Sequence, residues 1–166
     1  MTAARHSGKS RQALSVLLGL VLCAAISAPR PCEAAPEERT VVNASTGLAI
    51  SGFDPVAYFT DGAPKAGRPE MELRHGGVVW RFRNEGNRAA FAGHPEVYRP
   101  RFGGYDPVAI ARGTSVPGHP TVWAVIGERL YLFYDDAARA AFIAEPGRII
   151  ETATRKWPQV ARSIGR

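Results

Sequence analysis

The sequence predicts an α+β fold in which two tandem copies of one motif pack as a single pseudo-symmetric domain. Residues 52–57 (GFDPVA) return as residues 104–109 (GYDPVA), and residues 88–91 (RAAF) return as residues 139–142 (RAAF). The first block returns 52 positions further along the chain and the second block 51. Two matches in the same order and at nearly the same spacing indicate one supersecondary unit that is used twice. We expect the two copies to share a common apolar interior.

In each copy, the GFDPVA-like block is expected to form a turn and a short helix. A β-hairpin is expected to follow. In residues 72–82 the pair Gly76-Gly77 supplies the positive backbone angles of a tight turn between two strands. Residues 122–134 carry the second hairpin, which contains more β-branched and aromatic residues. We therefore expect the second hairpin to be the more deeply buried one.

A helix is expected after each hairpin. Asn84 and Asp135 are good N-caps, because a short polar side chain accepts hydrogen bonds from the free N–H groups of the first turn. Turns that contain Pro95 and Pro146 close these two helices. A final helix then carries four large apolar residues and is expected to kink or restart at Pro158. These four residues are Ile149, Ile150, Trp157 and Val160.

The start of the chain predicts export. Three basic residues precede a mostly apolar run at residues 13–26, and a small-residue stretch with Pro29 and Pro31 follows, which is typical of a secretory signal peptide. The run is shorter than the roughly 20 residues that cross a bilayer, so we expect no stable membrane insertion after cleavage. Cleavage after Ala34 would place the protein in the periplasm or outside the cell. The expected divisions are a signal peptide (1–34), an exposed lead-in (35–47), a first unit (48–98) and a second unit with the C-terminal helix (99–166).

Removal of the leader limits the chemistry of the mature chain. Cys23 and Cys32 both lie in the leader, so the mature chain has no thiol for disulfides, thiolate metal sites or thiol catalysis. The full chain has 21 basic and 15 acidic residues; without residues 1–34 these become 17 and 14, a net charge of +3. The basic residues are scattered, whereas nucleic-acid binding requires a continuous positive surface. We therefore exclude a nucleic-acid partner.

Several motifs occur together between residues 50 and 157. They are GFDPVAYF at residues 52–59, Gly77-x-x-Trp80-x-Phe82, the first RAAF block, Pro95-Glu96-x-Tyr98, FGGY at residues 102–105 and Trp157-Pro158. This pattern resembles YHS-domain proteins, and more narrowly the exported YHS-domain proteins. The resemblance implies a small α/β module, often associated in that family with the handling of heavy metals, and it does not imply an enzyme.

The chain departs from this family at the cysteines. Metal-associated members carry cysteines at the positions that here are Ala57, Arg83 and Asn87, and exported members commonly carry one where this chain has Asp106. No thiolate metal site is therefore expected, because copper(I) and thiolate-bound zinc require sulfur ligands. A divalent metal ion bound by nitrogen and oxygen ligands stays open as a cofactor.

The candidate metal ligands are two aspartates and three histidines. Asp54 and Asp106 occupy equivalent positions, and if they met between the copies they could share a cation or a proton. An aspartate before proline is also a favoured N-cap, which accounts for both residues by one inherited turn. His75, His94 and His119 offer imidazoles for zinc, nickel or copper(II), but none has ligand spacing, and exposed turns account for all three.

The FGGY block and the arginine before it form the candidate ligand site. Paired glycines let a ligand or another backbone segment come close, and aromatic residues can form a pocket wall. Nearby arginines could receive a carboxylate or phosphate, or could form a solvated basic rim. The site residues are Arg101, Phe102, Gly103, Gly104 and Tyr105.

These patterns favour an exported, non-enzymatic binding or accessory protein that binds a metal ion or a small anion. No Ser-His-Asp set, Walker loop or dinucleotide fingerprint is present. One alternative is a small periplasmic enzyme that uses Asp54 and Asp106 as acid and base. Another is a structural module whose FGGY face docks onto an envelope protein.

Overall fold

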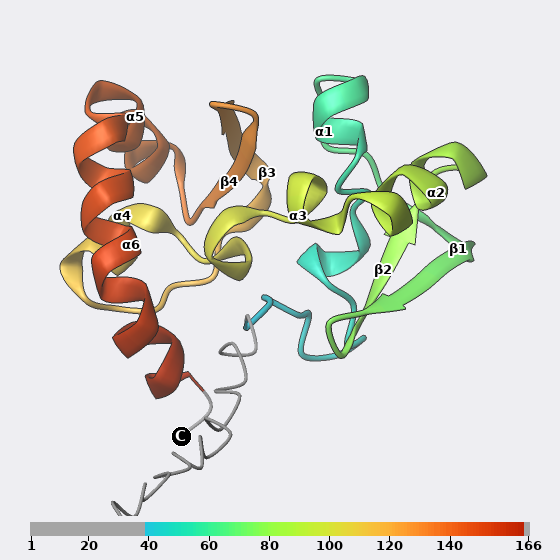
Figure 1. The fold of residues 1–166 in the computed structure, drawn as a ribbon, viewed down its shortest axis with the longest axis horizontal. Coiled ribbons are helices and arrows are strands. Elements are labelled where there is room, and N and C mark those ends of the chain that lie inside the picture. The colour runs from blue at the N-terminus through green and yellow to red at the C-terminus, as the bar shows by residue number, and fades with distance from the viewer. Residues whose placement is uncertain (1–38, 165–166) are drawn as a thin grey trace, which may run out of the picture. The chain divides into compact units, whose positions relative to one another are not determined.

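The computed structural model describes residues 39–164, which fold as the predicted α+β structure (Figure 1). Two antiparallel sheets of two strands each are combined with helices. The expected signal peptide and its cleavage site lie outside the described residues. Between residues 39 and 164, no helix has both the length and the apolar character needed to cross a membrane.

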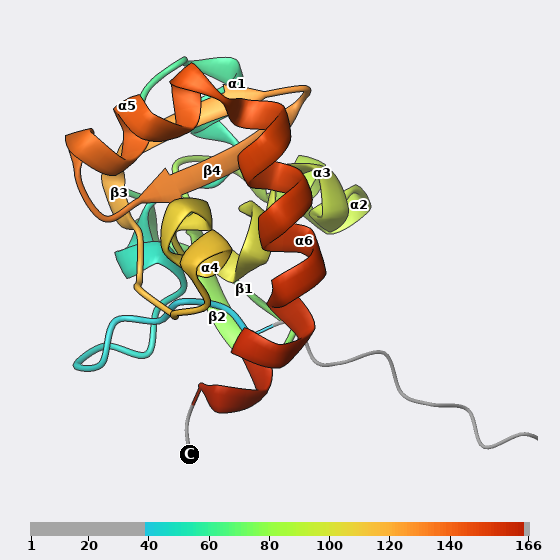
Figure 2. The ribbon, with the colours of Figure 1, turned by 90° about the vertical axis from the view of Figure 1, so that its left-hand side faces the viewer.

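The elements of this region follow an order that occurs twice. Each set has a short 3-10 helix, a short α-helix, a hairpin and two further helices. The first set is η1 (Ile50–Gly52), α1 (Ala57–Thr60), β1 (Arg68–His75), β2 (Val78–Phe82), α2 (Glu85–Gly93) and α3 (Pro95–Tyr98). The second set is η2 (Arg101–Gly104), α4 (Pro107–Arg112), β3 (His119–Ile126), β4 (Arg129–Phe133), α5 (Asp136–Ala144) and α6 (Pro146–Ser163). Within the second set, α4 and α6 lie side by side (Figure 2).

The two predicted hairpins are confirmed, and their strands pair in corresponding registers. Leu73 pairs with Trp80 in the first hairpin, and 51 positions later Ala124 pairs with Tyr131 in the second. The second hairpin is the more buried one, as predicted. β4 is buried from Leu130 onward to its end, whereas β1 alternates between half-buried and exposed residues.

The helix starts also agree with the sequence. The side chain of Asn84 accepts a hydrogen bond from the backbone N–H of the third residue of α2, and Asp135 does the same for α5, both at 2.8 Å. Pro95 and Pro146 occupy the first positions of α3 and α6. Of the two outcomes expected at Pro158, the restart is wrong, because α6 continues through that residue, and the kink stays a prediction. Burial of apolar residues on both sides of the proline offsets the hydrogen bond that it cannot donate.

The described residues bury two hydrophobic clusters, where a single common interior was expected. The first cluster includes Tyr58, Trp80, Phe82 and Phe91, and the second includes Phe102, Tyr105, Phe142 and Ile149. Strand β4 belongs to both, because successive side chains of a strand point to opposite faces. Leu130 and Leu132 enter the first cluster, while Tyr131 and Phe133 enter the second. The two clusters are thus separate but are joined through β4, and partly buried side chains of β3 also pack against each of them.

Most of the described lead-in residues are exposed, but the backbone of this segment is hydrogen-bonded to the rest of the fold. The N–H of Val41 donates to the carbonyl of Gly103 at 2.8 Å, and the N–H of Ile50 donates to the carbonyl of Val41 at 3.0 Å. The Val41 side chain is partly buried against the second cluster. An apolar β-branched residue beside a buried backbone explains why this segment is retained there.

Candidate functional site

The FGGY segment lies in the interior, and its backbone packs closely against another part of the chain. A Cβ atom on Gly103 would lie 1.6 Å from the carbonyl oxygen of Arg39, so only glycine fits against that backbone. Phe102 and Tyr105 are buried and both pack against Trp157, with ring centroids 5.8 Å apart in each pair. The two aromatic residues are therefore core residues, and the space beside Gly103 is filled by the lead-in.

Arg101 lies beside this segment, with its guanidinium carbon 5.4 Å from the centre of the Phe102 ring. It also lines a small cavity of about 140 Å³ together with Arg99 and Arg129. Arg129 donates to the backbone carbonyl of Glu96 at 3.2 Å. Burial lowers the pKa of Arg99 from its usual value. The expected basic rim is present here, with Arg112 elsewhere on α4.

The three histidines lie in separate surroundings. His94 and His119 are exposed, as predicted; His94 lies 3.7 Å from Glu96, and the Nδ1 atom of His119 lies 2.8 Å from the hydroxyl of Thr121. The exposed position predicted for His75 is wrong, since its ring is half-buried and packs edge-on against Phe91. Among residues 39–164, no three His, Cys, Asp or Glu side chains are grouped so that they could hold a metal ion.

Asp54 is fully buried and connects three elements of the first set. Its Oδ1 atom accepts a hydrogen bond from the N–H of Val56 at 2.9 Å, which forms the turn before α1. Its Oδ2 atom accepts from the N–H of Arg83 at 2.8 Å and from the side-chain amide of Asn87 at 2.7 Å. The carboxylate therefore holds the turn, the end of β2 and helix α2 together.

Asp106 is equally buried and forms a related set of bonds in the second set. Its Oδ1 atom accepts from the N–H groups of Val108 (2.7 Å) and Ala109 (3.4 Å), so the predicted N-cap is confirmed. Its Oδ2 atom accepts from the N–H of Tyr134 at 3.1 Å. All these donors belong to the second set, and no hydrogen bond joins the two carboxylates among the described residues.

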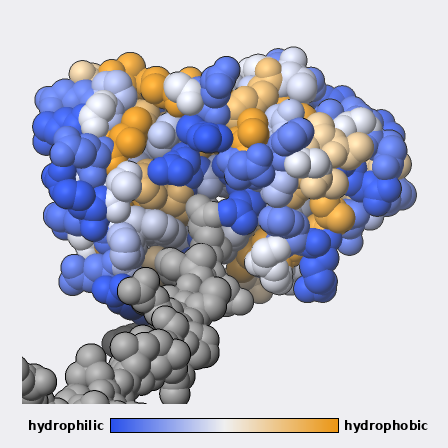
Figure 3. All heavy atoms as spheres, in the orientation of Figure 1, coloured by the Kyte–Doolittle hydropathy of each residue, from blue (hydrophilic) through white to orange (hydrophobic). Residues whose placement is uncertain are grey.

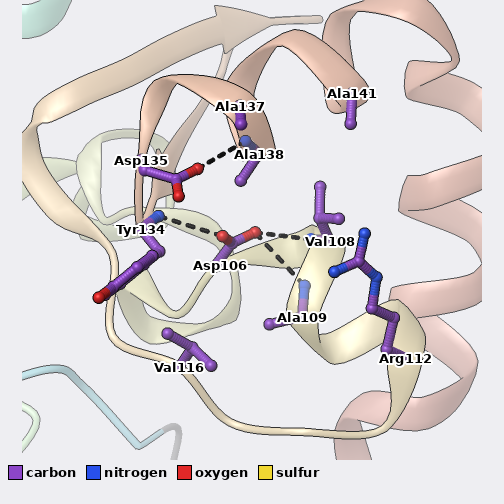
Figure 4. A pocket seen from close by; sticks show the side chains of 10 residues that line it. All are labelled: Asp106, Val108, Ala109, Arg112, Val116, Tyr134, Asp135, Ala137, Ala138 and Ala141. Carbon is purple, nitrogen blue, oxygen red and sulfur yellow. Dashed lines mark hydrogen bonds between the residues drawn. The ribbon is translucent and has the colours of Figure 1, made fainter.

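The two aspartates differ at one place. Position 138 corresponds to position 87 at the spacing of 51, and it holds an alanine where the first copy has Asn87. Asp54 Oδ2 therefore has two donors, whereas Asp106 Oδ2 has one. A cavity of about 250 Å³ opens beside Asp106 (Figure 4). The cavity is lined by Asp106, Val108, Ala109, Arg112, Val116, Tyr134, Asp135, Ala137, Ala138 and Ala141.

The walls of this Asp106 cavity combine small apolar side chains with charges of both signs. Alanine methyl groups from α4 and α5 form much of the apolar wall. Asp106 and Asp135 carry negative charge and Arg112 carries positive charge, with the three placed around the same space (Figure 4). Tyr134 also lines the cavity, and 63% of its surface is exposed. Such a cavity suits a small organic molecule with polar ends.

A second cavity of about 340 Å³ adjoins the first between α4, α5 and α6. The two cavities share Val108, Arg112 and Ala141 as lining residues. Its own polar residues include Glu145 and Arg148, which form an ion pair with each other. Because that pair is already neutral, the Asp106 cavity is the stronger candidate site.

Comparisons of this chain with models of protein families, with curated proteins and with solved structures found no match.

Sequence reasoning selected Asp106 but missed the cavity beside it. Ala138, Ala141 and Asp135 were not predicted as site residues, because alanines on a helix and a capping aspartate are common in proteins without a ligand. The signal was present in the repeat: alignment of the two copies sets Asn87 against Ala138. What the sequence could not indicate is that Asn87 donates to the equivalent aspartate, so that its loss opens space at a buried charge.

Proposed function

We propose that this chain is an exported, non-catalytic binding protein of the YHS family, and that it holds a small organic molecule in the Asp106 cavity. It consists of two YHS-like units with pseudo-symmetry. Support for the two units comes from the strand pairs and from the Asp54 and Asp106 turns, which recur at a spacing of 51 or 52 residues. The leader residues support export to the periplasm or the cell exterior.

The difference between Asn87 and Ala138 is the observation that supports a binding role for the second unit. The first unit closes the space beside its aspartate with an amide, and the second leaves the corresponding space open. The space beside the buried Asp106 carboxylate is open to solvent, so a small ligand can enter it.

The residues around the cavity favour an organic molecule over the other candidate ligands. A metal ion normally needs three or four converging ligands, and residues 39–164 hold no such group. A lone small anion would face two carboxylates, those of Asp106 and Asp135, against a single arginine. Acid/base catalysis by Asp54 and Asp106 has weak support, because each carboxylate binds N–H groups of its own unit.

Docking of an envelope protein has weaker support than ligand binding. The exposed large apolar residues of the described chain are Val42, Tyr134 and Ile143. On the face shown in Figure 3, apolar residues form separate patches between polar ones. A protein interface normally needs a larger contiguous apolar area.

The test compares the wild-type chain with Ala138→Asn. The asparagine copies the first unit, so we expect it to donate to Asp106 and to fill the cavity without unfolding the protein. Both proteins are screened by thermal shift against small amines, amino acids, carboxylic acids and sugars, and also against zinc, nickel and magnesium. A ligand at 100 times its dissociation constant adds about 2.7 kcal/mol to the free energy of unfolding.

We expect an organic compound to stabilise the wild type and to have no effect on Ala138→Asn. The matched control is Arg155→Gln on the exposed face of α6, which should respond as the wild type does. Stabilisation by a metal ion alone, or by a compound that acts equally on Ala138→Asn, would contradict the proposal. Export is tested separately by mass spectrometry of the secreted protein, for which we expect a mature chain that begins at Ala35.

A further inference from the structure

The Asp106 cavity carries charges that no described side chain neutralises. Asp135 uses its Oδ1 atom to cap α5 and forms no ion pair among residues 39–164. Asp106 likewise has only backbone N–H donors. The side chain of Arg112 is exposed, and it forms neither a hydrogen bond nor an ion pair with any side chain in the described part of the chain. Two carboxylates and one guanidinium thus line one cavity without partners of opposite charge.

The balance of charge at the Asp106 end is negative even when the helices are included. Asp106 and Asp135 lie at the N-termini of α4 and α5, whose dipoles place at most roughly +0.5 of a charge at each end. Two carboxylates therefore leave a net charge of about −1 beside the cavity. The Oδ2 atom of Asp106 has one donor fewer than its counterpart in Asp54. A ligand ammonium supplies both the missing donor and the missing positive charge.

Arg112 supplies positive charge to the same cavity. It is the last residue of α4, and its guanidinium lies next to Val108 in Figure 4. Because Asp106, Asp135 and Arg112 all line the cavity, one small molecule can contact both the carboxylates and the guanidinium. The guanidinium is a fork of donors that matches a carboxylate in geometry and charge.

The middle of the cavity limits the rest of the ligand. Ala109, Ala138 and Ala141 contribute methyl groups to the lining. In Figure 4 the Tyr134 ring lies on the side of Asp106 that faces away from Arg112. These walls accept a small apolar group, and the charged residues among the lining are Asp106, Asp135 and Arg112 alone. The volume of about 250 Å³ leaves room for such a molecule.

We infer that the ligand class of this site is a free α-amino acid with a small apolar side chain. Its ammonium group binds between Asp106 and Asp135, its carboxylate binds Arg112, and its side chain lies against the alanines. This inference rests on the proposed function, since it assigns a ligand class to the same cavity.

The experiment measures binding of three related probes to the purified chain by calorimetry and by NMR of the backbone amides. The probes are L-valine, isobutylamine, which lacks the carboxylate, and isobutyrate, which lacks the ammonium. Loss of one charge-assisted hydrogen bond weakens binding about tenfold or more. We therefore expect valine to bind at least about tenfold more tightly than either analogue, with amide shifts at Ala138 and Ala141.

Two variants test which charged residue binds which end of the ligand. Arg112→Gln should remove the advantage of valine over isobutylamine, and Asp135→Asn should weaken valine and isobutylamine but not isobutyrate. Arg155→Gln is the control and should bind valine as the wild type does. The inference is overturned if isobutylamine or isobutyrate binds as tightly as valine, or if Arg112→Gln leaves valine binding unchanged.

Failure of this inference is distinguishable from failure of the proposed function. If the amino-acid probes do not bind while another organic compound still loses its effect in Ala138→Asn, only the ligand class is wrong. If no compound shows a difference between the wild type and Ala138→Asn, the cavity is not a binding site and both proposals fail.

Discussion

Asp54 and Asp106 are the buried charged residues of the described chain. Hydrogen bonds from N–H groups of the protein replace the water that would surround each carboxylate in the unfolded chain. Each one accepts three hydrogen bonds, from a turn and from the residue that follows a strand. Of the two aspartates, only Asp106 is an N-cap: the N-cap of α1 is Val56, so the capping role predicted for Asp54 is wrong, and its carboxylate instead forms the turn that precedes α1. Each carboxylate fixes the start of a short helix to the end of the neighbouring hairpin.

Substitution of either aspartate by alanine should therefore cost more than the loss of a cap. We expect Asp54→Ala and Asp106→Ala each to lower the free energy of unfolding by about 3 kcal/mol, because several buried donors lose a charged acceptor. Asp135→Ala, an exposed cap, should cost about 1 kcal/mol. Urea denaturation of the three variants measures these values. A cost of about 1 kcal/mol for all three would mean that Asp54 and Asp106 contribute no more than a single exposed cap does.

Glu128 is a residue whose backbone does not suit its side chain. Its φ is 56°, and the corresponding residue of the first hairpin turn is Gly77, with φ of 78°. A residue other than glycine in this left-handed region is strained by about 1 kcal/mol or more. We expect Glu128→Gly to raise the free energy of unfolding by about 0.5–1 kcal/mol, and Gly77→Glu to lower it by a similar amount. Thermal and urea unfolding would show whether the two changes have opposite signs.

At the level of elements, the chain depends on one strand that is buried on both faces. Leu132 of β4 enters the first cluster, and its neighbour Phe133 enters the second. Leu132 also contacts the glycines of the second unit, since a Cβ atom on Gly118 would lie 2.6 Å from the Leu132 Cβ atom. β4 therefore connects the packing of both sets of elements.

Truncation of β4 residues should consequently destabilise the whole domain. We expect Leu132→Ala to lower the free energy of unfolding by about 2–5 kcal/mol, although this leucine belongs to the hairpin of the second set and packs in the first cluster. Leu73→Ala, on the half-buried strand β1, should cost less. Hydrogen exchange should show protection lost in β2 as well as in β4. Loss confined to the second set would contradict the shared role of the strand.

The elements were largely predictable because their signals are local. Gly76-Gly77 marks a turn, Asn84 and Asp135 mark helix starts, and all were found where expected. The number of clusters and the unbroken α6 were not predictable, because both depend on which faces meet in three dimensions. For the same reason the FGGY segment suggested a ligand site, although the partner that its glycines admit is the backbone of Arg39.

At the scale of the whole molecule, the hydroxyl of Tyr58 joins the two sets of elements. It donates to the carbonyl of Pro120 at 2.8 Å and belongs to the first cluster. Burial, and to a lesser extent the charge of Asp54, raise the pKa of Tyr58 well above its usual range. The phenol therefore keeps its proton in the folded state at pH values at which it is ionised in the unfolded chain.

This pKa shift predicts a loss of stability in strong base. Above pH of about 10 the unfolded state releases the Tyr58 proton and the folded state retains it, so the free energy of unfolding falls as the pH rises. Below that pH the stabilisation is fully present. In Tyr58→Phe the decline should be less steep, and its stability at neutral pH should be lower by about 1 kcal/mol for the lost hydrogen bond. Urea titrations between pH 7 and 11 give both quantities; equal slopes would contradict the assignment.

The two clusters should unfold together, although they are separate. Residues 39–164 belong to one compact unit, and β4, the Tyr58 hydroxyl and the Val41 backbone connect its two sets of elements. Removal of either set would expose one apolar face of β4 and leave the other set without part of its cluster. We therefore expect neither set to fold stably in the absence of the other, and unfolding to be two-state.

Tryptophan fluorescence can follow the clusters one at a time. Trp80 is buried in the first cluster, Trp123 packs against it, and Trp157 packs against the second. Variants in which Trp80 or Trp157 is the single remaining tryptophan, with Trp123 also replaced, therefore report on one cluster each. In each variant the fluorescence and the far-ultraviolet circular dichroism should change at the same urea concentration, because loss of either cluster exposes a face of β4. A fluorescence transition for Trp157 that precedes the loss of circular dichroism would show that α4, α5 and α6 can detach while the first cluster persists. In that case the Asp106 cavity, which lies between α4 and α5, would belong to a separately unfolding part of the molecule.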